Sequence, residues 1–203
     1  MIAANMSDPD QNSAWMDGLR RFIRRAVGRS QDHVEQNVGV GITEWPWRVR
    51  AAVRLAEKLP LVPPCRVADY GCGKQTLRAA LPADWTYVPI DYIERSSDTI
   101  LCDFTRQMPP GEYDLIFCLG VLEYLIEPGQ LLRHALDHGR FLVVSYHGRQ
   151  EGDRGRRQRE GWGSALSYDV LESLIREKGG MILEVNEQPR HERIYVCKGL
   201  HGT

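Results

Sequence analysis

A glycine-containing turn flanked by acidic residues is the part of the sequence best suited to chemistry. Asp69 ends an apolar run, and Gly71 and Gly73 follow it in VADYGCGKQTL, residues 67–77. Glycines have no Cβ, so the main chain there can approach a bound molecule closely. Asp91 ends the next apolar run 22 residues later, where a carboxylate can accept hydrogen bonds from both hydroxyls of a ribose. The pattern predicts a nucleotide-binding crevice.

Two further strand ends add suitable groups to the same crevice. The sequence Cys102-Asp103-Phe104 ends a third apolar run, and Leu119-Gly120 ends a fourth. An aromatic ring at Phe104 is suited to packing against adenine. Open α/β sheets bind ligands beyond the carboxyl ends of their strands. The alternative is that all these groups are ordinary turn residues at strand ends.

Short apolar runs alternate with helical segments, which is typical of a doubly wound, mostly parallel sheet. We expect strands at residues 66–70, 85–90, 99–104, 113–119, 141–146, 181–187 and 193–197, and helices at 46–59, 74–81, 128–138 and 168–178. Ser167 is the expected N-cap of the last helix, and Gly179 follows its end. The link between the last two strands is too short for a parallel crossover, so the last strand must be antiparallel.

We divide the chain into an N-terminal tail and helical extension or lid, residues 1–60, and a core, residues 61–203. Residues 14–29 have apolar side chains at helical spacing, with arginines on the other side. This helix could contact an anionic membrane surface peripherally or cover the site. The alternative is a docking helix with a solvated basic face.

Composition indicates a globular protein. Of 203 residues 42% are hydrophobic and 26% charged, and the net charge of −1 provides no general attraction to nucleic acid. The longest apolar run, residues 115–122, is too short to cross a bilayer, and the N-terminus does not resemble a signal peptide. The five cysteines form no C-x-x-C pair and lack histidines at zinc-ligand spacing. We therefore expect no metal, reduced core thiols and a cytoplasmic location.

The motifs together resemble the class I S-adenosylmethionine-dependent methyltransferase family. DYGCG resembles the family's acid and Gly-x-Gly after the first strand, PID the acid ending the second, CDF the end of the third, and YDLIFCLGVLEYL the fourth strand. The resemblance covers about residues 65–198 and includes the antiparallel last strand. It implies a seven-stranded, Rossmann-like methyltransferase fold with S-adenosylmethionine as cofactor.

The resemblance also implies roles for individual residues. The methionine part of the cofactor would lie at Asp69, Gly71, Cys72 and Gly73, the ribose at Asp91, and the adenine at Tyr92, Asp103 and Phe104, with Leu119 at the neighbouring strand end. Arg48, beside Trp45 and Trp47, could pair with the methionine carboxylate. The sequence departs from the family at Gln75, where a small residue is common. A nicotinamide dinucleotide site would instead favour glycine at the position of Thr76.

Methyl transfer to oxygen needs alignment and is helped by a general base. His147, which ends the fifth strand, is our first candidate, followed by Glu123 and Tyr124 after the fourth strand. Many enzymes of the family need no base. His147 could instead cap main-chain groups, and Glu123 could be a solvated or helix-capping acid.

The segment GRQEGDRGRRQREG, residues 148–161, should lie over the methyl-acceptor site. It carries five arginines, and Arg149, Arg154, Arg156 and Arg157 could bind a phosphate or carboxylate of the acceptor. The alternative is a solvated, flexible loop.

We therefore expect a methyltransferase that methylates oxygen on a small polar acceptor such as a sugar or glycan. One alternative is an RNA or protein methyltransferase that uses the basic 148–161 segment, although no RNA-binding module is visible. Another is a non-catalytic, cofactor-binding subunit. The sequence leaves the oligomeric state open.

Overall fold

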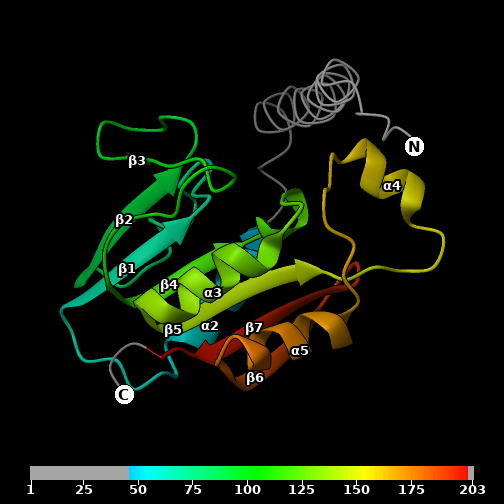
Figure 1. The fold of residues 1–203 in the computed structure, drawn as a ribbon. Helices are drawn as coiled ribbons and strands as arrows, with labels where there is room; N and C mark the ends of the chain where they lie inside the picture. The colour runs from blue at the N-terminus through cyan, green and yellow to red at the C-terminus, as the bar shows by residue number, and fades with distance from the viewer. Residues whose placement is uncertain (1–45, 201–203) are drawn as a thin grey trace, which may run out of the picture.

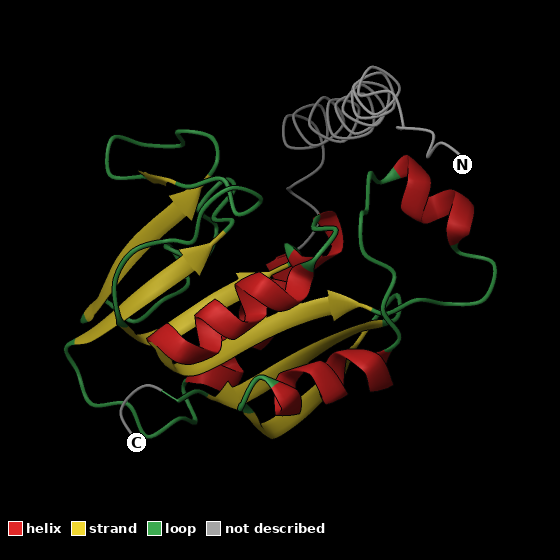
Figure 2. Ribbon diagram, viewed as in Figure 1, coloured by secondary structure: helices red, strands yellow, loops and turns green. Residues whose placement is uncertain are grey.

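Seven strands form one sheet in the order β3-β2-β1-β4-β5-β7-β6 (Figures 1 and 2). The computed structural model describes residues 46–200, so the predicted helix 14–29 and Trp45 lie outside the described residues. The strands are β1 (Cys65–Tyr70), β2 (Trp85–Asp91), β3 (Ile100–Leu101), β4 (Tyr113–Leu119), β5 (Gly139–His147), β6 (Met181–Gln188) and β7 (Glu192–Lys198). The predicted seven-stranded sheet is confirmed.

Strand pairing determines which side chains meet at one edge. Strands β1 to β5 pair in parallel, so their carboxyl ends lie together. Strand β7 pairs antiparallel to β5 and to β6, as predicted from the short link. Its direction brings Glu192, the first residue of β7, opposite His147, the last residue of β5. The carboxyl edge of the parallel strands therefore also receives the beginning of β7.

Helices cover both faces of the sheet. Helix α2 (Pro46–Ala56) lies behind it in Figure 1, whereas α3 (Pro128–His138) and α5 (Tyr168–Glu177) lie in front. The short helices η2 (Leu122–Tyr124) and α4 (Arg154–Arg159) lie in the connections that follow β4 and β5. Helix α3 begins with proline at its first turn, where no main-chain donor is needed. The Ser167 hydroxyl caps α5 by accepting from Val170 N, which confirms the predicted N-cap.

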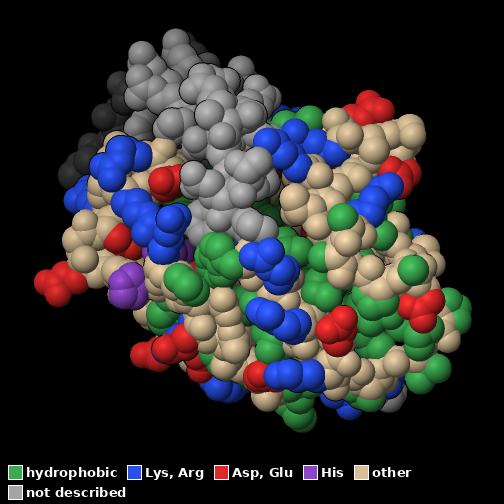
Figure 3. All heavy atoms as spheres, turned by 180° about the vertical axis from the view of Figure 1, so that it is seen from behind, with side chains coloured by type: hydrophobic (Ala, Val, Ile, Leu, Met, Phe, Trp, Pro, Cys, Tyr) green, Lys and Arg blue, Asp and Glu red, His purple; other side chains and the backbone are tan. Residues whose placement is uncertain are grey.

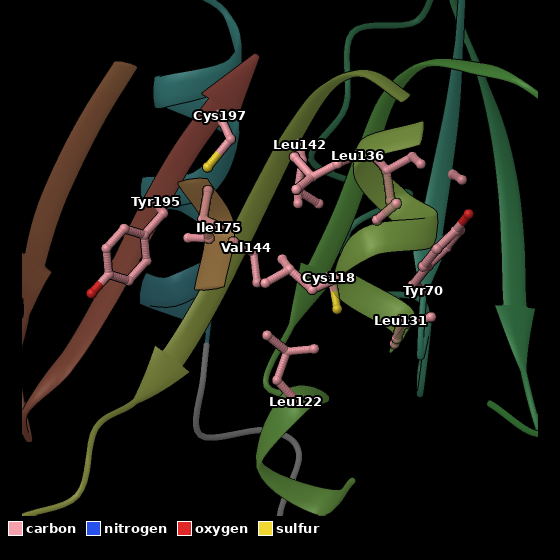
Figure 4. Packing of buried hydrophobic residues seen from close by; sticks show 14 of the residues in the cluster. Tyr70, Cys118, Leu122, Leu131, Leu136, Leu142, Val144, Ile175, Tyr195 and Cys197 are labelled. Carbon is pink, nitrogen blue, oxygen red and sulfur yellow. The ribbon is translucent and has the colours of Figure 1, made fainter. Parts of the chain in front are cut away.

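Two apolar clusters lie on the two faces of the sheet. The cluster under α3 and α5 includes Leu131, Leu136 and Ile175, which pack against Val144 and Tyr195 of the strands (Figure 4). The other cluster joins the buried face of α2 to β1, β4, β5 and β7. Helix α2, which we assigned to the N-terminal extension, thus packs against the same sheet as the other helices.

The structure differs from the sequence prediction between β1 and β2 and around β3. Residues 74–81 form a series of turns and not the predicted helix. Gln75 has φ of 57°, a left-handed conformation that a helix does not continue through. Strand β3 is only two residues long, although we predicted residues 99–104. The chain that leaves the carboxyl end of β1 therefore continues as turns and not as a helix.

All five cysteines are buried and free, as expected for core thiols. They are Cys65, Cys72, Cys102, Cys118 and Cys197. Among residues 46–200, no helix has the length and apolarity needed to cross a membrane.

The packing predicts a large difference between two leucine substitutions. Leu136 is fully buried between α3 and the sheet, whereas Leu183 on the edge strand β6 is 47% exposed. Leu136→Ala should lower the free energy of unfolding by about 3 kcal/mol, because it removes buried methyl groups and leaves a cavity. Leu183→Ala should change it by less than about 0.5 kcal/mol. Urea unfolding followed by circular dichroism measures both, and equal losses would contradict the assigned packing.

Candidate functional site

The Gly71–Gly73 turn is held directly against the end of β2. The main-chain N–H groups of Gly71 and Cys72 donate to Ile90 O at 2.8 and 3.1 Å, and Gly73 N donates to Asp91 Oδ2 at 2.8 Å. Gly71 and Gly73 have φ of 73° and 48°, and a Cβ on Gly71 would overlap the Val121 side chain. The structure thus brings together the glycine turn and the acid that the sequence singled out.

Asp69 ends β1 in a buried position beside this turn. Its Oδ2 accepts a hydrogen bond from the Tyr87 hydroxyl at 2.7 Å. Burial raises the pKa of the Asp69 carboxyl to about 7, the Tyr87 hydrogen bond lowers it, and the nearby Asp91 charge raises it further. Tyr87 was not among the residues predicted from the sequence.

Asp91 is buried, and main-chain donors hold both of its oxygens. Besides Gly73 N, it accepts from Ile93 N at 3.1 Å, and Arg95 Nε lies 4.0 Å from its Oδ2. Arg95 Nη2 is buried and has no hydrogen-bond partner among the described residues. A carboxylate has about four lone-pair sites, so Asp91 retains capacity to accept further hydrogen bonds.

The three residues predicted to surround the adenine lie in different surroundings. Asp103 Oδ1 accepts from Thr105 N and Oγ1 at 3.0 and 2.7 Å, within its own turn. The Phe104 ring lies 5.6 Å from the Tyr70 ring, against the core under α3. Tyr92, at the end of β2, is 36% exposed. Of these aromatic side chains, Tyr92 is thus the more accessible to a ligand.

Glu123, in helix η2, is buried at the end of β4. Its Oε1 accepts from His147 N at 2.8 Å, and its Oε2 is buried with no hydrogen-bond partner among the described residues. Burial raises the pKa of Glu123 to about 7, Arg48 lowers it, and Glu192 raises it. A group that titrates near neutral pH can take up a proton under ordinary conditions.

Glu192 and Arg48 form an ion pair beside Glu123. Arg48 Nε of α2 lies 2.5 Å from Glu192 Oε1, and Glu192 is 1% exposed. The Arg48 guanidinium also lies so near the end of β4 that a Cβ on Gly120 would overlap it. We did not predict Glu192 from the sequence. The available signal was an acidic residue at the start of the strand ERIYVCK, whose middle, residues 194–197, is apolar.

His147 is enclosed by side chains of the connection that follows β5. Its ring lies 5.0 Å from the Trp162 ring, and Arg156 Nη1 lies 3.4 Å from its Nε2. Burial, followed by the charges of Arg156 and Arg157, lowers the pKa of His147 to about 4. The imidazole is therefore neutral at pH 7. Burial raises the pKa of Tyr124, the third candidate, above its usual value.

Residues 148–166, which we call the α4 segment, are fixed over Glu123 by a buried arginine. Arg157 donates to Ser164 O at 2.5 Å, to His147 O at 3.2 Å and to the Tyr146 hydroxyl at 3.3 Å. Ser164 N in turn donates to Glu123 O at 3.0 Å. The predicted loop thus contains a helix and an internal anchor.

The arginines predicted to bind an acceptor divide into two groups. Arg157 is 5% exposed and its contacts are internal. The prediction that its side chain faces a bound acceptor was therefore wrong. Arg156 packs on His147, whereas Arg149, Arg154 and Arg159 are exposed. Lys and Arg side chains gather on the surface around α4 (Figure 3). The exposed arginines remain available to a bound anion.

Within the described part of the chain, no group of three His, Cys, Asp or Glu side chains is arranged to hold a metal ion. The carboxyl edge instead combines a glycine turn, the acids Asp69 and Asp91 on adjacent strands, and the buried acids Glu123 and Glu192. Such groups are able to accept hydrogen bonds and to take up a proton.

No family model and no curated protein matches this chain. Among solved structures, an S-adenosylmethionine-dependent methyltransferase from Leishmania major has a TM-score of 0.64 at 15% identity, with 85% of this chain and 83% of that chain covered. The magnesium protoporphyrin IX methyltransferase of Synechocystis PCC 6803, with SAH bound, has a TM-score of 0.56 at 17% identity, with 82% and 87% covered.

A third similar structure is CalO1, a methyltransferase in calicheamicin biosynthesis, also with SAH bound. Its TM-score is 0.54 at 18% identity, and the match covers 75% of this chain and 54% of that one. The chain thus spans little more than half the length of CalO1. These likenesses show that the chain has the class I methyltransferase fold, as its sequence motifs predicted.

The buried Glu123 carboxyl predicts a specific pH dependence of stability. Its pKa is raised from 4.5 to about 7 on folding. The folded protein therefore binds more protons than the unfolded chain between these values, and the associated stability is lost as pH rises through 7. Glu123→Gln removes this titration and keeps an acceptor for His147 N. Between pH 5 and pH 8 the variant should lose about 2.5 kcal/mol less stability than wild type.

Urea unfolding at both pH values measures this difference. The matched control is Glu184→Gln, whose side chain pairs with Lys58 on the surface. The control should follow the wild-type pH dependence. Parallel curves for wild type and Glu123→Gln would show that Glu123 is ionised in the folded protein at both pH values.

Proposed function

We propose that the chain is an S-adenosylmethionine-dependent methyltransferase that methylates oxygen on a small polar acceptor such as a sugar or glycan. The observation that carries the proposal is the hydrogen bond from Gly73 N to Asp91, which fixes the glycine turn against the acid at the end of β2. Asp69 lies on the adjacent strand beside the same turn. The fold and the SAH bound in two similar structures agree with this proposal.

The residues present fit this cofactor. Asp91 would accept the ribose hydroxyls, because its oxygens retain acceptor capacity beyond their two main-chain donors. The Gly71–Gly73 turn and Asp69 would hold the methionine part, and Tyr92 would lie along the adenine. When bound, S-adenosylmethionine supplies an electrophilic methyl group on a sulfonium. The chain then has to orient the acceptor and remove its proton.

Glu123 is the general base in this proposal, in preference to His147. Its unpartnered Oε2 and its pKa of about 7 suit proton uptake, whereas His147 is enclosed and has a pKa of about 4. The acceptor oxygen would take the methyl group that the bound cofactor supplies, and the carbon–sulfur bonding pair would remain on the cofactor's sulfur. The hydroxyl proton passes to Glu123 Oε2. His147 holds Glu123 through its main-chain N–H.

The exposed arginines near α4 favour a second candidate, methylation of RNA or protein. Arg149, Arg154 and Arg159 face solvent on the α4 segment, which contacts Glu123 O through Ser164 N. Phosphate contacts release counterions, so RNA binding through them should weaken steeply with salt. A salt titration with RNA tests this candidate, and binding that is absent or independent of salt would exclude the RNA form.

Calorimetry with S-adenosylmethionine tests the cofactor assignment. Wild type should bind it, and Asp91→Ala should bind at least about tenfold more weakly, because two hydrogen bonds to a charged acceptor are lost. Asp137→Ala, on α3 and in a surface pair with Arg133, is the matched control and should bind like wild type. Absence of binding by wild type, or undiminished binding by Asp91→Ala, would refute the assignment.

A second pair of variants tests the base. Glu123→Gln should lower the rate of methyl transfer by about 10²- to 10⁴-fold, the usual contribution of a general base, while cofactor affinity stays close to wild type. His147→Ala should reduce turnover less. Transfer of labelled methyl groups to hydroxylated small molecules measures both rates. A larger loss in His147→Ala than in Glu123→Gln would restore His147 as the base.

A further inference from the structure

Two carboxylate oxygens at the carboxyl edge are buried with neither a hydrogen bond nor an ion-pair contact among the described residues. They are Oε2 of Glu123 and Oε2 of Glu192, in residues that are 2% and 1% exposed. Neither oxygen accepts a hydrogen bond from any residue that the structure describes. Buried acceptors are nearly always satisfied, and a buried charge left without donors is strongly destabilising. The described residues therefore leave these two oxygens in need of donors, which a bound molecule can supply.

Main-chain geometry places Glu123 and Glu192 next to the same residue, His147. Glu123 Oε1 accepts from His147 N, and His147 is paired with Glu192 across the β5–β7 ladder. Residues directly opposite in an antiparallel pair have Cα atoms about 4.5–5.5 Å apart. The two carboxylates thus lie near one another, and the Glu192 charge raises the pKa of Glu123.

The charges around the pair restrict what such a molecule can be. Both side chains can only accept hydrogen bonds when ionised, and the two acids share one neighbouring guanidinium, Arg48. A phosphate or carboxylate of the ligand would be repelled there. Arg48 balances the charge of Glu192, and Glu123, whose pKa is raised to about 7, can become neutral by taking up a proton. The remaining need is therefore for hydrogen-bonding groups and not for a cation. Hydroxyl groups supply them without adding another charge.

We propose that Glu123 and Glu192 together bind two neighbouring hydroxyls of the methyl acceptor, which is an uncharged polyhydroxylated molecule. The hydroxyl on Glu123 Oε2 is the one methylated, and the adjacent hydroxyl donates to Glu192 Oε2. Arg48 holds the Glu192 carboxylate in place through its ion pair. This inference rests on the proposed function and adds Glu192 as a residue that selects the acceptor.

Small ring alcohols test this selection in wild-type protein saturated with S-adenosylhomocysteine. The probes are cis-1,2-cyclohexanediol, cyclohexanol, and cis-2-aminocyclohexanol, which carries an ammonium group at pH 7. Ligand-observed NMR should show the diol binding at least about tenfold more tightly than cyclohexanol, because it makes one more hydrogen bond to a charged group. The amino alcohol should bind no more tightly than the diol.

Variants assign the preference to Glu192. Glu192→Gln should lose most of the advantage of the diol over cyclohexanol while keeping its affinity for S-adenosylhomocysteine. Glu184→Gln on β6, in its surface pair with Lys58, should keep that advantage. Since Glu192→Gln leaves Arg48 with a weaker partner, the double variant Arg48→Met/Glu192→Met replaces the buried pair as a unit. It should bind diol and cyclohexanol equally.

Three results would overturn the inference: equal binding of diol and cyclohexanol to wild type, tighter binding of the amino alcohol than of the diol, or an unchanged diol preference in both Glu192 variants. The same experiment distinguishes failure of the proposed methyltransferase function from failure of this inference about the acceptor. If S-adenosylhomocysteine does not bind, the methyltransferase assignment falls. If it binds and the diol shows no preference, only the acceptor class is wrong.

Discussion

Everything at the candidate site depends on how the strands end. Parallel pairing of β1, β2, β4 and β5 brings Asp69, Asp91 and Glu123 to one edge, and the reversed β7 adds Glu192 to it. The edge thus concentrates carboxylates that are almost entirely shielded from water. Removing charges from water is costly unless they are paired or hydrogen-bonded. Main-chain N–H groups that donate to Asp91 and Glu123 offset part of this desolvation cost.

The individual acids are satisfied to different extents. Asp91 receives two main-chain N–H groups, whereas Asp69 has one tyrosine hydroxyl and Glu123 one N–H. The pKa values of Asp69 and Glu123 rise to about 7 because burial dominates over these few donors. Such incompletely satisfied groups reduce stability, and they are typical of sites that bind or exchange protons with a ligand.

Much of the fold could be predicted from local sequence, because its signals are local. Apolar runs specified β4, proline and leucine spacing specified α3, and the short link before β7 required an antiparallel strand. The predicted helix at 74–81 was wrong. An eight-residue helix is marginal by itself, and Gln75 adopts a left-handed conformation that depends on its surroundings.

The glycine turn and Asp91 could be located because strand ends set their positions. Residues defined by long-range contacts could not be located. Glu192 acquires its importance from pairing with His147 and from Arg48 of α2, neither of which is close to it in sequence. The burial of Arg157 depends on carbonyls contributed by Ser164 and His147. Its charge suggested a solvent-facing residue, but its contacts make it an anchor of the α4 segment.

A crystal structure of the protein with S-adenosylhomocysteine would test the central claim most directly. The account predicts that both ribose hydroxyls donate to Asp91 and that the homocysteine part lies along the Gly71–Gly73 turn. A nucleoside bound elsewhere on the sheet, with Asp91 still occupied only by Gly73 and Ile93, would contradict it.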